Sequence, residues 1–388
     1  MGLIPPPPEE FKPIAMLMSF FFTVVFIGYA VVAGLRRKLL SILIDLPHPT
    51  DTYTAHDILR ITQKQDFVFW HARGMEFAYL RLLSIKQISE TLASIKTDSP
   101  DLLMTNVAEF MDMVDLIVSE LTDRVSTADR VETVLKRIAY FKQMSKLSDA
   151  TWVYMACLFA TQPITWIQYG GFRQILLGFE AEAYTLIWRD ISMRIGLKNI
   201  PTTYTDMQEY VNSFEKENAG ESEHTARFAK CVIDASAQSA SVMAGNSQIV
   251  KRLYPMAVSV YATESMRHVL HLPTPPAYGK VLLSTMMCAT AVFVSYCLVP
   301  RKVPHMRTKD EVNTDGKYDV AYVMYGSGAS VKGGYLIERV GPASMLSDDG
   351  MGKICDGIPK TVQVAITDNP EEVDKNAPKK LAEAEAST

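Results

Sequence analysis

Lys142 is the residue whose type and position most strongly suggest a chemical role. It lies in AYFKQM (139–144), at the end of a stretch whose apolar residues recur at helical spacing: Val131, Val134, Leu135 and Ile138. At about 100° per residue, Lys142 projects near the middle of this apolar stripe. Two interpretations stay open. Either the long stem lies along apolar surface and lifts the ammonium to water at the helix end, or burial holds a neutral amine that acts as a base or binds a metal.

The histidines offer few constellations. His71, in DFVFWHARGMEFAYLRLL (66–83), has aromatic neighbours and is either a buried ligand or a hydrogen-bonded core histidine. His268 and His271 are spaced to share one helix face, but the helix must end before Pro273, which favours ordinary polar residues at a helix end. The glycine-rich GSGASVKGG (326–334) fits neither phosphate-binding pattern and predicts a loop.

Composition excludes several classes of function. The formal net charge of the 388 residues is -4, and no long Lys/Arg block interrupts the chain, so a nucleic-acid partner is not expected. The five cysteines are scattered and contain no CxxC pair, which indicates neither a disulfide framework nor a zinc site.

Residues 14–35 form an uncharged apolar run long enough to cross a membrane. Glu9, Glu10 and Lys12 precede the run, whereas Arg36, Arg37 and Lys38 follow it, the reverse of a cleaved signal peptide. The run therefore predicts a single-pass anchor, with residues 1–13 outside the cytoplasm and the remainder in the cytosol. For a second apolar run, residues 281–300, spanning the bilayer and forming a buried or membrane-resting helix both stay open.

The rest of the sequence predicts a mainly α protein with one large helical domain, residues 50–300. Residues 301–367 predict an irregular C-terminal appendage with strand-like runs at 319–325 and 361–366, and residues 368–388 a disordered tail. Helical spacing marks these segments: 56–63, 66–83, 86–95, 102–122, 128–146, 148–159, 172–196, 204–218, 224–243 and 249–270.

Several stretches, in order, resemble one protein family. They are an xxPIxWI turn ending at Ile167, a helix around Trp188, RIGLKNIP (194–201), EKEN (215–218), ESMRHVLHLPTPP (264–276), LVPRKVP (298–304), NTDGKY (313–318) and GYLIERVGP (334–342). In type and order they resemble the endoplasmic-reticulum-bound oxygenases of mycophenolic acid biosynthesis, which belong with the latex-clearing rubber oxygenases. The resemblance covers most of residues 60–345.

This resemblance implies a mostly α-helical fold that holds haem b between helices and uses dioxygen to cleave isoprenoid double bonds. It also implies a lipophilic, isoprenoid-like substrate and a catalytic body held at the endoplasmic reticulum membrane, facing the cytosol.

The resemblance also exposes departures at the haem. In the family, the helix matching residues 128–146 presents a histidine to the iron, and here that position holds Lys142. Of the stretch that faces the other side of the haem in the family, only Arg81 and Ile85 are kept. Ligation by Lys142 requires a neutral amine, at a cost of about 4.6 kcal/mol at pH 7.

Two functions follow. The first is a membrane-anchored haem oxygenase with Lys142 at the iron, Arg81 in the distal pocket and His71 as the next candidate ligand. The second is a non-catalytic, membrane-tethered binding or accessory protein that has lost haem.

Overall fold

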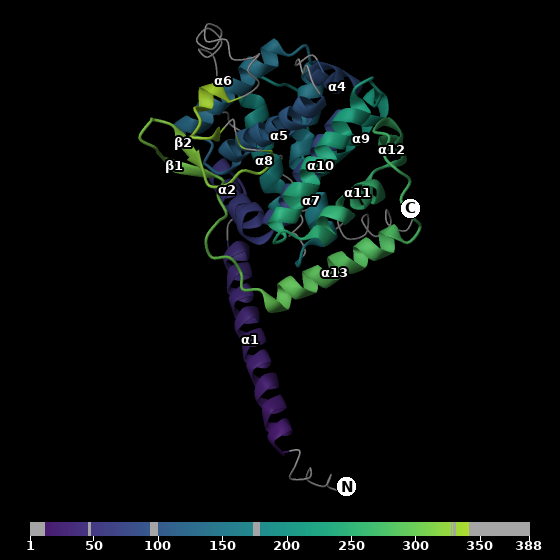
Figure 1. Cartoon of the computed structure of the whole chain (residues 1–388). Coiled ribbons are helices and arrows are strands. Elements are labelled where there is room, and N and C mark those ends of the chain that lie inside the picture. The colour runs from purple at the N-terminus through teal and green to yellow at the C-terminus, as the bar shows by residue number, and fades with distance from the viewer. Residues whose placement is uncertain are drawn as a thin grey trace.

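The structure is a computed structural model that describes residues 12–45, 48–93, 100–173, 179–326, 328 and 331–340. Helices dominate it and confirm the mainly α prediction (Figure 1). Their bounds are α1 Lys12–Asp45, α2 Thr52–Ile61, α3 Val68–Leu83, α4 Lys86–Ala93, α5 Pro100–Thr122, α6 Asp129–Met144, α7 Asp149–Gly170, α8 Phe179–Arg194, α9 Tyr204–Asn218, α10 Thr225–Met243, α11 Gln248–Tyr261, α12 Glu264–Val269 and α13 Gly279–Cys297.

Helix α3 lies at the centre of the body and packs against α7 and α10. Most of its side chains are buried, including charged Arg73 and Glu76. The crossing with α7 is close because Gly74 presents no side chain there: a Cβ at this position would lie 2.4 Å from the Cα of Pro163. Next to the crossing, the rings of Phe77 and Trp166 pack with centroids 5.4 Å apart. Gly74 therefore sets how near the two central helices lie.

Helix α7 is longer than its predicted range of 148–159. It continues through Pro163 to Gly170, so the predicted xxPIxWI turn is wrong. Proline removes one backbone hydrogen bond inside a helix. Residues on either side of it are buried in the core, Ile164 and Trp166 among them, and this packing holds the helix together across the lost bond.

The predicted helix 249–270 is two helices. Its break comes at Ala262 and Thr263, where the Thr263 side chain accepts a hydrogen bond from the Met266 backbone N–H and starts α12. Arg267 donates to the carbonyls of Ser259 and Ala262, which the break leaves without helical partners. The polar cap at Thr263 thus divides the helix, although the apolar spacing continues across the break.

The C-terminal segment is irregular, as predicted, and it lies on the body. Strands β1 (Thr308–Val312) and β2 (Tyr318–Val320) pair antiparallel, and a 3-10 turn, η4 (Ile337–Arg339), packs on α6. The strand-like run 361–366, the tail 368–388 and residues 1–11 lie outside the described residues.

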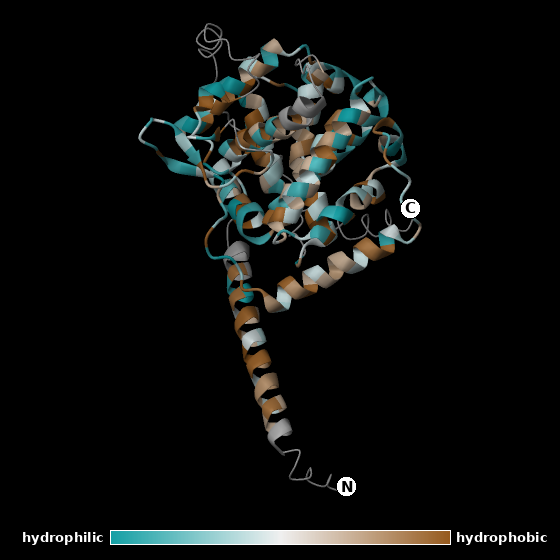
Figure 2. Ribbon diagram, viewed as in Figure 1, coloured by the Kyte–Doolittle hydropathy of each residue, from teal (hydrophilic) through white to brown (hydrophobic). Residues whose placement is uncertain are grey.

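Two helices carry apolar surface that the body does not cover. Helix α1 extends alone from the body, and α13 lies across the base of the body near the basic end of α1 (Figure 1). Both are largely brown in Figure 2, where brown marks hydrophobic residues. By length and composition, residues Met16–Leu39 and Gly279–Cys297 each could cross a membrane.

The α3–α7 crossing makes a prediction about Gly74. Gly74→Ala should lower the free energy of unfolding by about 1–3 kcal/mol, because the added methyl group meets backbone that cannot rotate away. Gly34→Ala on α1 is the matched control, since no atom lies within 4 Å of the added Cβ. Thermal unfolding of both variants in detergent measures the difference, and equal melting temperatures would contradict the close crossing.

Candidate functional site

Lys142 lies in the last turn of α6, and its side chain is 19% exposed. The Nζ atom lies 2.9 Å from Oδ1 of Asp149, whose side chain is 66% exposed at the start of α7. The long stem thus runs along the body and delivers the ammonium to an ion pair that water reaches. An ammonium group in an ion pair has no lone pair to offer a metal.

Arg81 lies in the last turn of α3 and is fully engaged. Its Nε and Nη2 donate to Oε1 and Oε2 of Glu215 at 2.8 and 2.9 Å, and its Nη1 donates to Oε1 of Gln162 at 2.5 Å. Tyr154 also donates to Glu215 Oε1, at 2.7 Å. Burial acts to lower the pKa of Arg81, but the charge and hydrogen bonds of Glu215, with smaller contributions from nearby tyrosines, together raise that pKa. This guanidinium binds α9 to the centre of the body.

His71 lies in the first turn of α3, with its ring 6.2 Å from the ring of Tyr184 on α8. Burial, with a smaller contribution from the charge of Lys64, lowers the pKa of His71 to about 3. The imidazole is therefore neutral at physiological pH. Within the described part of the chain, no hydrogen bond to its ring nitrogens is found, and the Tyr184 hydroxyl is also buried without a partner.

Within the described residues, no hydrogen bond or ion pair joins His71, Arg81 or Lys142 to one another. His71 and Arg81 are ten residues apart on α3, which separates them by about 15 Å along the axis and turns them to different faces. Lys142, on α6, shares no ion-pair or hydrogen-bond partner with either of them in the described residues. The charges of Arg81 and Lys142 are each compensated locally, by Glu215 and by Asp149.

A buried network on α3 was not predicted from the sequence. Arg73 Nη2 lies 2.7 Å from Glu76 Oε1, and Tyr254 on α11 donates to Glu76 Oε2 at 2.8 Å. Burial raises the pKa of Glu76 to about 7, although the charge of Arg73 acts to lower it. The available signal was a charged pair at i and i+3 within an otherwise apolar helix.

The C-terminal segment is tied to α5 by a second buried network. Arg307 pairs with Asp112 at 2.7 Å and with Asp115, and Asp112 Oδ1 accepts the backbone N–H groups of Met324 and Tyr325 at 2.9 and 3.0 Å. Both networks hold segments of chain together, and neither contains the spacing of a nucleophile and its base. The sequence patterns did not predict these polar contacts of the C-terminal segment.

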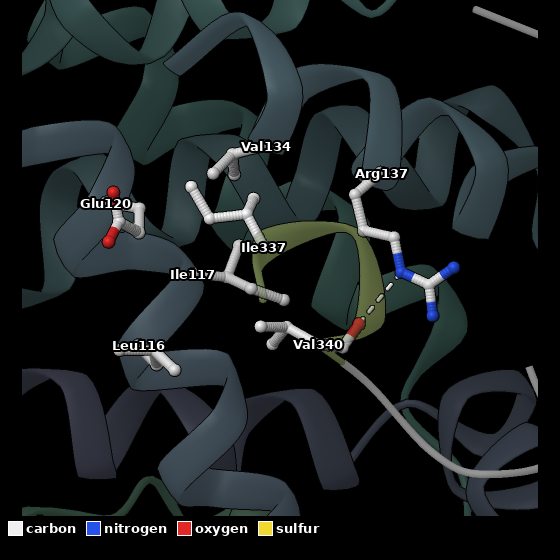
Figure 3. Close-up of a pocket in the computed structure, with 7 residues that line it drawn as sticks. All are labelled: Leu116, Ile117, Glu120, Val134, Arg137, Ile337 and Val340. Carbon is white, nitrogen blue, oxygen red and sulfur yellow. Dashed lines mark hydrogen bonds between the residues drawn. The ribbon is translucent and has the colours of Figure 1, made fainter. Parts of the chain in front are cut away.

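A cavity lies where the C-terminal segment covers α5 and α6 (Figure 3). It measures about 10 Å³, and the size corresponds to about one water molecule. At its edge Arg137 Nε donates to the Val340 carbonyl at 2.8 Å. The lining residues are Leu116, Ile117, Glu120, Val134, Arg137, Ile337 and Val340. This cavity has the properties of a packing defect and not of a substrate site.

The residues that the resemblance would place at a haem are already engaged with other side chains. A haem ligand must offer a lone pair, whereas Lys142 Nζ is engaged in an ion pair with Asp149, and Arg81 is bound on both sides of its fork. Metal clusters are also missing: the described residues include no group of three or more His, Cys, Asp or Glu that could hold an ion. His271 pairs with Glu221 at the surface and not with His268.

Glu76 makes a prediction about pH. In the folded chain the Glu76 carboxyl keeps its proton up to about pH 7, whereas an ordinary glutamate releases its proton near pH 4.5. The free energy of unfolding should therefore fall as pH rises between these two values. Glu76→Gln copies the neutral carboxyl and should remove this loss, on the order of 2–3 kcal/mol. Urea unfolding of both proteins at pH 5 and pH 7.5 measures it. Parallel losses in wild type and variant would show that Glu76 is not the titrating group.

Comparison with family models and with curated proteins identifies no similar protein. The chain matches no model of a known protein family and has no significant match among curated proteins. Any assignment of function to this chain therefore depends on the geometry of the described residues.

Proposed function

We propose that this chain is a membrane-tethered helical protein that binds a lipophilic ligand or a partner at the bilayer surface without haem chemistry. The observation that carries the proposal is the Lys142–Asp149 ion pair, at 2.9 Å. It occupies the amine that haem ligation by Lys142 would need. The resemblance to the rubber and mycophenolic oxygenases then concerns the scaffold and not the reaction.

The membrane part of the proposal depends on α1. Its span Met16–Leu39 is only 6% buried by the rest of the protein, so its apolar side chains need another cover, and a bilayer provides one. Arg36, Arg37 and Lys38 at the body end favour a cytosolic body. The endoplasmic reticulum is the membrane that the family resemblance suggests.

Energetics favour the non-haem proposal over ligation by Lys142. The amine would have to leave the Asp149 carboxylate before it could offer a lone pair to iron. A cofactor that bound Arg81 would take this cation away from Glu215, whose side chain is only 20% exposed. Each change removes an interaction that already satisfies a charge.

A haem oxygenase with His71 as the iron ligand is the second candidate. His71 favours it because its imidazole is neutral and no described residue bonds to its ring nitrogens. Bound haem would supply dioxygen activation, the chemistry that cleaves an isoprenoid double bond. In this candidate His71 would hold the iron and Tyr184 would lie beside it.

The absorption spectrum separates the two candidates. Full-length protein, extracted in detergent from cells supplied with a haem precursor, should show no Soret band at stoichiometric intensity. A strong band that His71→Ala abolishes would establish the second candidate. His56→Ala is the matched control, because His56 is also buried but bonds to Thr122 and Ser126. A band lost in Lys142→Ala would contradict the non-haem proposal directly.

The ion pair itself makes a quantitative prediction. In a double-mutant cycle of Lys142→Ala and Asp149→Ala, the coupling energy should stay below about 1 kcal/mol, because water reaches both side chains. Chemical unfolding in detergent micelles gives the four stabilities. A coupling of about 3 kcal/mol or more would indicate a desolvated pair and a buried lysine.

A further inference from the structure

Helix α13 exposes apolar side chains along its whole length. Its most hydrophobic stretch is only 11% buried. The exposed set includes Val281 (69%), Val292 (51%), Phe293 (54%) and Tyr296 (51%). A soluble surface does not carry such a continuous apolar strip, so a partner or a lipid phase must cover it.

The opposite face of α13 is packed against the body. Leu283 and Met287 are buried, and Tyr261 on α11 donates to the Met287 sulfur at 3.2 Å. A Cβ on Gly279 would lie 3.1 Å from Val260. These contacts hold the first half of the helix on the body, so it does not project away as α1 does (Figure 1).

The second half of α13 is held by Arg36, at the basic end of α1. Its guanidinium donates to the carbonyls of Ser295 at 3.0 Å, Leu298 at 2.8 Å and Val294. A cation at this end also complements the helix dipole. Arg36 stacks over the Phe172 ring at 4.3 Å, so α1, α13 and the body meet at one point.

The two helices run in clearly different directions from this junction: α1 leaves the body, whereas α13 follows its base (Figures 1 and 2). If α1 crosses the bilayer, its basic end lies at the lipid headgroups. A helix tied to that end and directed sideways then lies in the plane of the interface. Length and hydropathy alone cannot separate this arrangement from a second span, but the contacts along the inner face do.

Charge around α13 suits an anionic surface. Lys280 precedes its apolar residues and Arg301 and Lys302 follow it, all three exposed, and residues 279–307 contain no Asp or Glu. Arg37, at the basic end of α1, is also exposed and adds a further positive charge beside α13. Tyr278 and Tyr296 are exposed near the two ends, where aromatic rings favour the headgroup region.

We propose that α13 is an in-plane membrane helix that seats the body on an anionic phospholipid surface, with Arg36 as the corner that joins it to α1. The proposal rests on the membrane anchoring by α1 proposed above and adds a second, independent contact with lipid. It gives the body one fixed orientation on the membrane.

Spin-label depth in vesicles of phosphatidylcholine and phosphatidylserine tests this inference. Val281→Cys and Val292→Cys are labelled one at a time in full-length protein with Cys288, Cys297 and Cys355 replaced by Ser. The two positions are eleven residues apart, hence about 16 Å along the axis and within about 20° on one face. An in-plane helix predicts equal depths, within about 3 Å, at the headgroup boundary.

Other outcomes overturn the inference separately from the anchor. Depths that differ by about 16 Å would make α13 a second span, and both labels in water would leave it uncovered by lipid. A label at Ile27→Cys, in the middle of α1, reports the anchor by itself. If that label alone lies in water while the α13 labels lie in lipid, the anchor fails and the in-plane contact stands.

Arg36→Ala tests whether Arg36 holds the C-terminal end of α13 next to α1. The label at residue 292 should become more mobile, because three carbonyl contacts are lost, whereas the label at residue 281 should not change. Arg36→Lys is the matched control for charge, and it cannot reproduce all three hydrogen bonds at once. Unchanged mobility at residue 292 in both variants would show that Arg36 does not hold this end.

Discussion

A charged group that leaves water for the interior of a helical body costs several kcal/mol unless an opposite charge meets it there. This constraint determines much of the structure. Lys64 meets Asp123 at 2.7 Å, Arg73 meets Glu76 at 2.7 Å, and Arg307 meets Asp112 at 2.7 Å. The Lys64 and Arg307 pairs each join segments that are far apart in the sequence, and the Arg307 pair fixes the C-terminal segment on α5, whereas Arg73 and Glu76 lie one turn apart on α3.

The same constraint applies at Lys142, where the family resemblance suggests an axial histidine. Lys142 follows an apolar stripe on α6, and Asp149 at the start of the next helix pairs with it. Arg81 is compensated in the same manner by Glu215. Both side chains then stabilise contacts between helices, and a cofactor would have to compete with those contacts. This competition is the physical reason for favouring a scaffold without haem.

Sequence spacing predicted the fold well where one force dominates. The helical periods of α3, α6 and α9 reflect burial in the body, whereas the apolar length of α1 is a property of its composition. Errors came where local polar chemistry decides, as at the Thr263 cap that divides α11 from α12, or where tertiary packing overrides propensity, as at Pro163. For the site, spacing identified Lys142 as unusual but could not name Asp149 as its partner, because the direction of the intervening turn sets that contact. The Arg73–Glu76 pair had a signal, its i and i+3 spacing in an apolar helix, but spacing could not name Tyr254 on α11 as the further partner of Glu76.

The proposed in-plane α13 and the paired charges together describe a body that lies on a membrane and presents a lipophilic surface, with no iron at the position of Lys142. Native mass spectrometry of the full-length protein, released from lipid nanodiscs after expression with a haem precursor, tests this most directly. The mass of the polypeptide, with or without lipid, is the expected result. A dominant species heavier by one haem, which disappears in Lys142→Ala, would contradict it.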